Sequence, residues 1–172
     1  MNTALIVIES CSGNTRLIAE AVAAGLKDGG TDARVFDVAQ APTALPAGID
    51  LLILGAPTHN RGLPTAATRA QAHRQGGTTA SSGGMREWLA RTAIPAALPV
   101  AVFDTVTSRT WLSGSAAEAI AKALRRGRGR DTAVVGSFLV QGQSGPLADG
   151  EETSARAWGR ALEDSTSGRS AR

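Results

Sequence analysis

The chain is short of residues that cross-link a protein or carry it through a membrane. Its 172 residues include a single cysteine, Cys11, which cannot form an internal disulfide. No apolar run is long enough to cross a bilayer, and the N-terminus lacks the basic, apolar, small-residue order of a secretion signal. Because cytosolic proteins are poor in disulfides, we expect a cytoplasmic protein with no membrane partner.

Aromatic and metal-binding residues are also scarce. Aromatic residues make up 3% of the chain, and tyrosine is absent. The two histidines, His59 and His73, have no third ligand at metal spacing, so no metal site is expected. Walker A and Gly-x-Gly-x-x-Gly patterns are missing, which excludes the commonest nucleotide-binding loops.

Acidic residues are slightly outnumbered, 15 against 18 basic residues, for a net charge of +3. Spread over one domain, this excess is weak support for acidic or nucleic-acid partners. The densest basic cluster, residues 125–130, follows a predicted helix whose C-terminal dipole favours cations. No aromatic residue is interleaved for stacking on bases, so nucleic acid is not an expected partner.

Short apolar runs alternate with stretches of helical spacing along the chain. Strand-length runs occupy residues 4–8, 34–38, 50–55, 99–103 and 132–140, and helical spacing occurs at 17–26, 85–89, 115–124 and 155–162. Residues 65–84 have no core-forming period, and their end is expected to be a mobile loop. Strands joined through helices form a parallel sheet covered on both faces, so the predicted class is α/β. One domain is expected over residues 1–164, followed by a disordered tail at 165–172.

The first junction between strand and helix has the composition of a phosphate site. Residues 10–15, Ser-Cys-Ser-Gly-Asn-Thr, supply hydroxyls beside the free N–H groups and positive dipole of a helix N-terminus. The alternative is that Ser12 or Asn14 only caps the helix. A helix N-terminus would also stabilise a Cys11 thiolate. Arg16 follows too closely for the loop of a tyrosine phosphatase, so we interpret Cys11 as a variable loop position.

Two further polar loops, at residues 56–64 and 104–113, follow the third and fourth predicted strands. Ligands of parallel sheets bind outside the carboxyl ends of the strands. The three loops are therefore expected to meet at one edge of the sheet.

These loops resemble those of the flavodoxin family. Ser10, Gly13 and Thr15 match its phosphate loop, and Ser12 keeps the hydroxyl of the third position. Residues 57–63, Pro-Thr-His-Asn-Arg-Gly-Leu, resemble the segment that walls one face of the flavin, with His59 in place of an aromatic residue. Residues 103–111 resemble the segment that ends in a stacking tyrosine, with Trp111 at that position.

The resemblance implies a three-layer, doubly wound sheet of five parallel strands in the order 2-1-3-4-5, and non-covalently bound FMN. The phosphate would lie on the first loop and the ring between the other two. The implied cofactor-binding residues are Ser10, Cys11, Ser12, Gly13, Asn14, Thr15, Pro57, Thr58, His59, Asn60, Arg61, Gly62, Asp104, Thr105 and Trp111. No side chain is a candidate catalyst.

The expected function is electron transfer through the flavin, with an unidentified redox protein or small acceptor as partner. If Arg61 or Arg109 reaches the pyrimidine edge of the ring, its charge favours the anionic reduced form. That favours a flavoprotein that passes electrons from a donor to a small acceptor over a low-potential carrier. Two alternatives stay open: a reductase of a quinone or similar molecule, and a flavin-free scaffold that acts as a binding or regulatory module. The scaffold is favoured by Asp104 and Val106, which replace glycines of the family's third loop.

Overall fold

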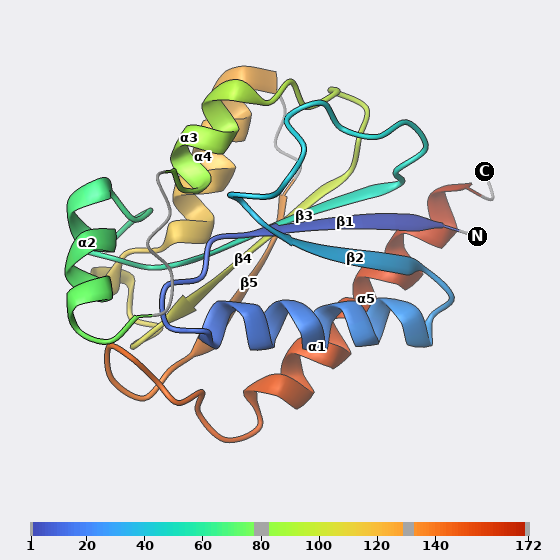
Figure 1. The fold of residues 1–172 in the computed structure, drawn as a ribbon. Coiled ribbons are helices and arrows are strands. Elements are labelled where there is room, and N and C mark those ends of the chain that lie inside the picture. Colours follow the sequence, from blue (N-terminus) through green and yellow to red (C-terminus); the bar gives the residue numbers. More distant parts are fainter. Residues whose placement is uncertain (1, 78–82, 129–132, 171–172) are drawn as a thin grey trace.

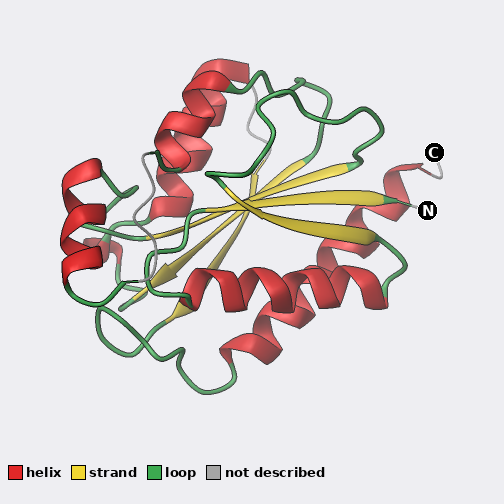
Figure 2. Cartoon of the chain, in the orientation of Figure 1, coloured by secondary structure: helices red, strands yellow, loops and turns green. Residues whose placement is uncertain are grey.

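The computed structural model describes residues 2–77, 83–128 and 133–170, with the backbone alone described at 111, 128, 133 and 166–170. The described chain contains a five-stranded parallel sheet in the order β2-β1-β3-β4-β5 (Figures 1 and 2). Its strands are β1 (Thr3–Ile8), β2 (Asp32–Asp37), β3 (Leu51–Pro57), β4 (Val100–Val106) and β5 (Ala133–Leu139). The predicted α/β class and strand order are confirmed.

Helices cover both faces of the sheet, as Figure 1 shows. On one face lie α1 (Asn14–Asp28) and α5 (Glu151–Ser170), and on the other α3 (Met85–Arg91) and α4 (Ala116–Arg128). A separate apolar cluster fills each interface, because β1, β3 and β4 send alternate buried side chains to opposite faces. Gly25 and Gly159 let α1 and α5 cross with their backbones in contact, because a Cβ at either glycine would collide with the facing helix.

Strand β4, which lies between β3 and β5, extends beyond its predicted end at Phe103. Asp104 pairs with Ser137 of β5, and Thr105 pairs with Phe138. The first part of the expected third loop is therefore sheet. The polar residue Asp104 concealed this extension, because an apolar pattern ends where a buried polar residue begins.

A helix, α2 (Ala66–Arg74), occupies a segment in which the sequence shows no helical period. Thr65 and Thr68 form a capping box at its start, and Arg69 is its one fully buried residue. Apolar periodicity does not predict this helix, because α2 has no apolar stripe. Of the expected mobile loop that follows, residues 78–82 lie outside the described residues.

The last helix, α5, continues to Ser170. This differs from the disordered tail expected from residue 165, and residues 171–172 lie outside the described part. None of the described helices is long and apolar enough to cross a membrane.

Candidate functional site

A hollow of about 250 Å³ lies at the carboxyl edge of the sheet, where the three expected loops meet. It is lined by ten of the predicted site residues, Cys11, Ser12, Asn14, Thr15, Pro57, Thr58, His59, Asn60, Arg61 and Thr105. Four others, Ser10, Gly13, Gly62 and Asp104, are not among its lining residues. The side chain of Trp111 lies outside what the structure describes, although its backbone opens a short 3-10 turn, Trp111–Ser113.

The first loop ends at an N-terminus of α1 that no side chain caps. Gly13 is the N-cap residue, with a φ of 88° that suits glycine. The alternative in which Ser12 or Asn14 caps the helix is therefore wrong. Asn14 instead donates to the carbonyl of Ser144 (3.0 Å), and the hydroxyl of Thr15 bonds that of Thr105 (3.0 Å).

Cys11 is a buried residue of this loop. Burial raises the pKa of its thiol to about 12, and the nearby charge of Glu9 adds to the rise. The thiol is therefore protonated at neutral pH, contrary to the expectation of a stabilised thiolate. The structure thus gives no support to a cysteine nucleophile at this helix end.

The second loop is a tight hairpin. His59 and Gly62 exchange backbone hydrogen bonds of 2.9 and 3.0 Å, and both residues between them have positive φ, 45° at Asn60 and 70° at Arg61. Positive φ at both central positions defines a type I′ turn, in which arginine is unusual. Burial, and then the charge of Arg69, lower the pKa of His59, so its ring is neutral at pH 7.

Arg61 joins the second loop to the third. Its Nε donates to the carbonyl of Leu112 (2.8 Å), and the backbone of Arg61 lies against Gly114, where a Cβ would collide with it. Arg109 is placed differently. Its guanidinium forms an ion pair with Glu151 (2.8 Å) and binds the carbonyl of Ser137, so of the two candidate arginines only Arg61 lines the hollow.

Asp104 lies below the hollow with a fully buried side chain. Its carboxylate accepts hydrogen bonds from the hydroxyls of Thr58 (3.1 Å), Ser115 (2.5 Å) and Ser137 (2.6 Å), and from the N–H of Ala117 (3.2 Å). It therefore caps α4 and holds β5 and the second loop. Asp104 is not among the lining residues of the hollow, whereas its neighbour Thr105 is, so a flavin contact at Asp104 stays a prediction.

One wall of the hollow comes from α2 and was not predicted. Thr68, Gln71, Ala72 and Gln75 line it. These residues recur at the i, i+3, i+4, i+7 spacing of one helix face. A polar face of this kind has no apolar period, so only the position of the helix reveals its role.

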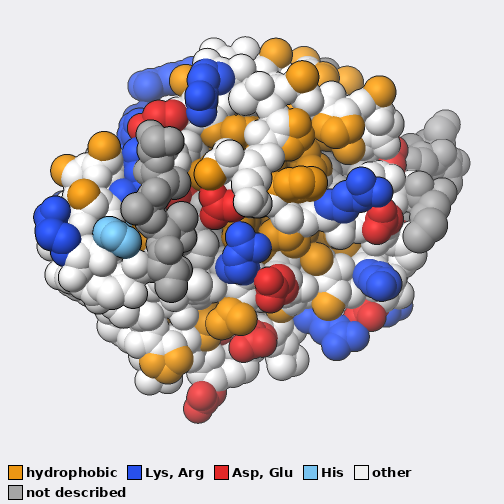
Figure 3. Space-filling view, in the orientation of Figure 1, with side chains coloured by type: hydrophobic (Ala, Val, Ile, Leu, Met, Phe, Trp, Pro, Cys, Tyr) orange, Lys and Arg blue, Asp and Glu red, His pale blue; other side chains and the backbone are white. Residues whose placement is uncertain are grey.

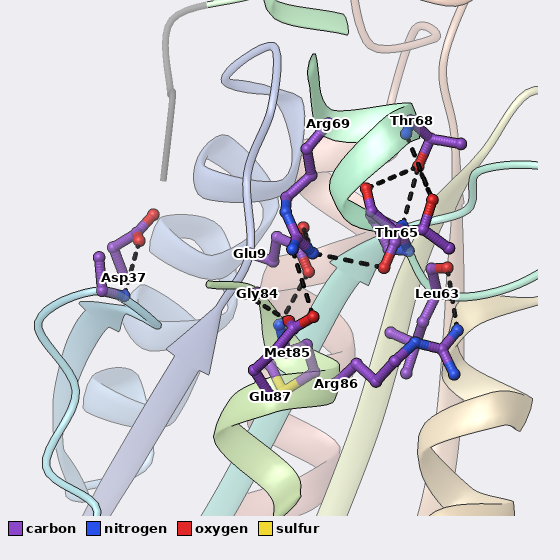
Figure 4. Close-up of polar contacts among 12 residues, drawn as sticks. Glu9, Asp37, Leu63, Thr65, Thr68, Arg69, Gly84, Met85, Arg86 and Glu87 are labelled. Atoms are coloured by element: carbon purple, nitrogen blue, oxygen red, sulfur yellow. Dashed lines mark hydrogen bonds and ion pairs between the residues drawn. The ribbon is translucent and has the colours of Figure 1, made fainter. Parts of the chain in front are cut away.

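A buried ionic cluster supports this wall (Figure 4). Arg69 of α2 lies 3.4 Å from Glu9 and 3.3 Å from Glu87, and Glu9 also accepts from the N–H of Met85 (2.8 Å). Burial raises the pKa of Glu9, while the Met85 bond and Arg69 partly offset the rise. The sequence offered no sign that Glu9 and Arg69, sixty positions apart, would meet.

The surface around these elements carries both signs of charge. Figure 3 shows acidic and basic side chains interspersed over the visible face. The described residues also hold no group of three or more His, Cys, Asp and Glu side chains placed to bind a metal ion.

Residues 6–86 match the sequence model of the flavodoxin family. No curated protein matches the chain. Among solved structures, a flavodoxin from the domain Archaea is 17% identical with a TM-score of 0.63, and the match covers 96% of this chain and 99% of that one. Flavodoxin 1 from Bacillus cereus is 18% identical with a TM-score of 0.61 over 92% of this chain and 95% of that one. The NAD(P)H:quinone oxidoreductase from Methanothermobacter marburgensis is 17% identical with a TM-score of 0.58 over 94% and 99%.

The solved structures establish the fold, and the family match spans both residues 10–15 and the second loop. Residues 6–86 are therefore similar in sequence to the flavodoxin family, and the described chain has the flavodoxin fold.

Proposed function

We propose that this chain holds FMN in the hollow at the carboxyl edge of the sheet, with the phosphate on residues 10–15. The observation that carries the proposal is the uncapped start of α1, which opens beside Ser12 and Thr15 in the lining of the hollow. The first N–H groups of a helix have no partner within it, and they favour an anion. A phosphate fits this donor set, because hydroxyls and N–H groups all donate to it.

The remaining lining residues fit the other parts of the cofactor. His59 is neutral and half-buried, so it can pack against a flat ring without the cost of burying a charge. Thr105 and Val106, at the end of β4, also line the hollow. The bound flavin supplies the redox chemistry, and the chain binds it, orients it and shields it from water.

A negative charge at position 12 should separate phosphate binding from ring binding. Ser12→Asp places a carboxylate at the helix N-terminus, which the fold tolerates because the dipole favours it there. The same carboxylate repels a phosphate, so FMN should bind at least about 10-fold more weakly, or about 1.4 kcal/mol. Riboflavin, which lacks the phosphate, should bind as it does to the wild type. Both affinities follow from quenching of flavin fluorescence.

Ser12→Ala is the matched control and should have little effect on either ligand. Equal losses for FMN and riboflavin in Ser12→Asp would contradict the placement of the phosphate. A colourless wild-type protein that binds neither flavin would overturn the proposed function.

We also propose that Arg61 raises the reduction potential of the bound flavin, so that the chain delivers electrons to an acceptor more readily than a low-potential carrier does. Arg61 lines the hollow, whereas Arg109 is paired with Glu151. Removing the positive charge in Arg61→Gln should lower the two-electron midpoint potential by about 20–40 mV, the equivalent of about 1–2 kcal/mol. Potentiometric titration measures the change, and Arg61→Lys should keep the wild-type value. An unchanged potential in Arg61→Gln would remove Arg61 from this role.

A further inference from the structure

The face of α2 that lines the hollow carries two amide side chains, Gln71 and Gln75. Both are solvent-exposed, and neither amide makes a hydrogen bond within the part of the chain that the structure describes. A glutamine amide can donate two hydrogen bonds and accept others at the same time. The two side chains therefore match a ligand group that both donates and accepts, as a hydroxyl does.

The helix runs along the hollow from one loop to another. It begins directly after the second loop, at Ala66, and its C-terminal end lies against the first loop. There, a Cβ at Gly77 would lie 2.7 Å from the carbonyl oxygen of Cys11. The amide-bearing face therefore covers the space between the phosphate loop and the loop expected beside the ring.

The position of α2 depends on one buried side chain. Arg69 is 5% exposed, and no other residue of the helix is buried. It contacts Glu9, which directly precedes the phosphate loop, Glu87 of α3, and the carbonyl of Pro64. Figure 4 shows this side chain reaching from α2 toward Glu9 and the start of α3. The cluster therefore ties the wall of the hollow to the loop at its end.

We propose that Gln71 and Gln75 bind the ribityl chain of FMN, and that Arg69 is the positioning residue that holds them there. The proposal rests on the proposed function, because it assigns the middle of the same cofactor. The ribityl chain joins the phosphate to the ring, and its hydroxyl groups both donate and accept hydrogen bonds. The wall formed by Gln71 and Gln75 lies between the two loops, and its uncharged amides can hydrogen-bond the hydroxyl groups of a ribityl chain.

Three flavins distinguish the possible contacts of this wall. FMN has a phosphate and a ribityl chain, riboflavin has the ribityl chain alone, and lumiflavin has neither. Each lost hydrogen bond should weaken binding roughly 5-fold, so Gln71→Ala/Gln75→Ala should bind FMN and riboflavin about 25-fold more weakly. Lumiflavin should bind with unchanged affinity. Ala70→Gln, which places an amide on α2 away from the hollow, is the matched control and should change none of the three affinities.

Arg69→Lys tests the positioning role without removing the buried charge. Lysine has no planar guanidinium group and cannot contact Glu9 and Glu87 at the same time as arginine does. The variant should therefore bind FMN and riboflavin more weakly and bind lumiflavin with unchanged affinity. In the flavin-free protein, hydrogen exchange of the α2 amides should become faster, whereas exchange in α1 should keep its wild-type rate. Unchanged exchange in α2 would refute the positioning role.

The outcomes separate this inference from the proposed function. Wild-type affinity for riboflavin in the double glutamine variant overturns the inference and leaves FMN binding intact. An equal loss for lumiflavin also overturns it, because the amides would then contact the ring. A wild-type protein that binds none of the three flavins overturns both.

Discussion

Replacing Arg69 with methionine is expected to lower the free energy of unfolding by about 3–5 kcal/mol at pH 7. The change leaves Glu9, 2% exposed, without the cation that compensates its charge. Removing one partner of a buried ion pair costs far more than the pair contributes, because the remaining charge stays buried. Urea denaturation followed by circular dichroism measures the loss, with Arg74→Met as an exposed control on the same helix.

The loss should depend on pH in a defined direction. Burial already raises the pKa of Glu9 in the folded protein, and removal of Arg69 raises this pKa further. A carboxyl whose pKa is higher in the folded than in the unfolded state destabilises the protein once pH exceeds the unfolded value. The deficit of Arg69→Met should therefore shrink as pH falls from 7 toward the unfolded pKa of glutamate. Glu9→Gln/Arg69→Met should recover much of the stability at pH 7, and a deficit that is independent of pH would contradict this account.

Asp104→Ala is expected to destabilise the fold by about 3 kcal/mol and to loosen the second loop. The side chain is fully buried, and three hydroxyls and one N–H donate to its carboxylate. Hydrogen bonds to a charged group each contribute about 1.5–3 kcal/mol, and alanine would leave buried donors without a partner. The loss exceeds that of most core substitutions, because one residue serves β5, α4 and the loop at Thr58 together.

Thermal and urea unfolding measure the stability of this variant, and FMN titration measures the effect on the hollow. Asp104→Asn keeps the size and one acceptor oxygen, so it should lose less stability than alanine. The hydroxyl of Thr58 donates to Asp104 and accepts from the N–H of Ala116 (2.8 Å). Loss of the Asp104 acceptor should therefore loosen Thr58, and FMN affinity should fall in both variants to the extent that Thr58 becomes disordered. A stable Asp104→Ala protein with wild-type flavin affinity would show that the network is dispensable.

The junction of strand, hydroxyl-rich loop and helix at residues 3–28 could be predicted from the sequence because all of its determinants are local. A buried strand, a loop of hydroxyls and Gly13, and the first turn of α1 are consecutive, so the junction follows from their order alone. The element order likewise implied a parallel sheet, since each crossover carries a helix. The alternative of a side-chain cap is wrong, because the N-cap residue is Gly13, which has the left-handed conformation and no side chain to cap the helix.

The α2 wall and the burial of Asp104 depend on distant partners. Arg69 has the sequence properties of a surface arginine, and only the approach of β1 and α3 buries it. Asp104 has the sequence properties of a loop residue, and only the pairing of β4 with β5 places it inside a strand. Burial of a charge depends on what packs around it, which neighbours in the sequence do not specify.

The alternation of apolar runs with helical segments, together with one hydroxyl-rich turn, determined by itself that this chain forms a flavodoxin-like sheet with a polar loop at its carboxyl edge. Tertiary structure alone decided which side chains face that site: it withdrew Asp104 and Arg109 into hydrogen bonds and ion pairs, and it brought in Gln71 and Gln75. The physical reason is range. Strand and helix patterns depend on residues a few positions apart, whereas a pocket wall depends on the packing of segments that the chain brings together from afar.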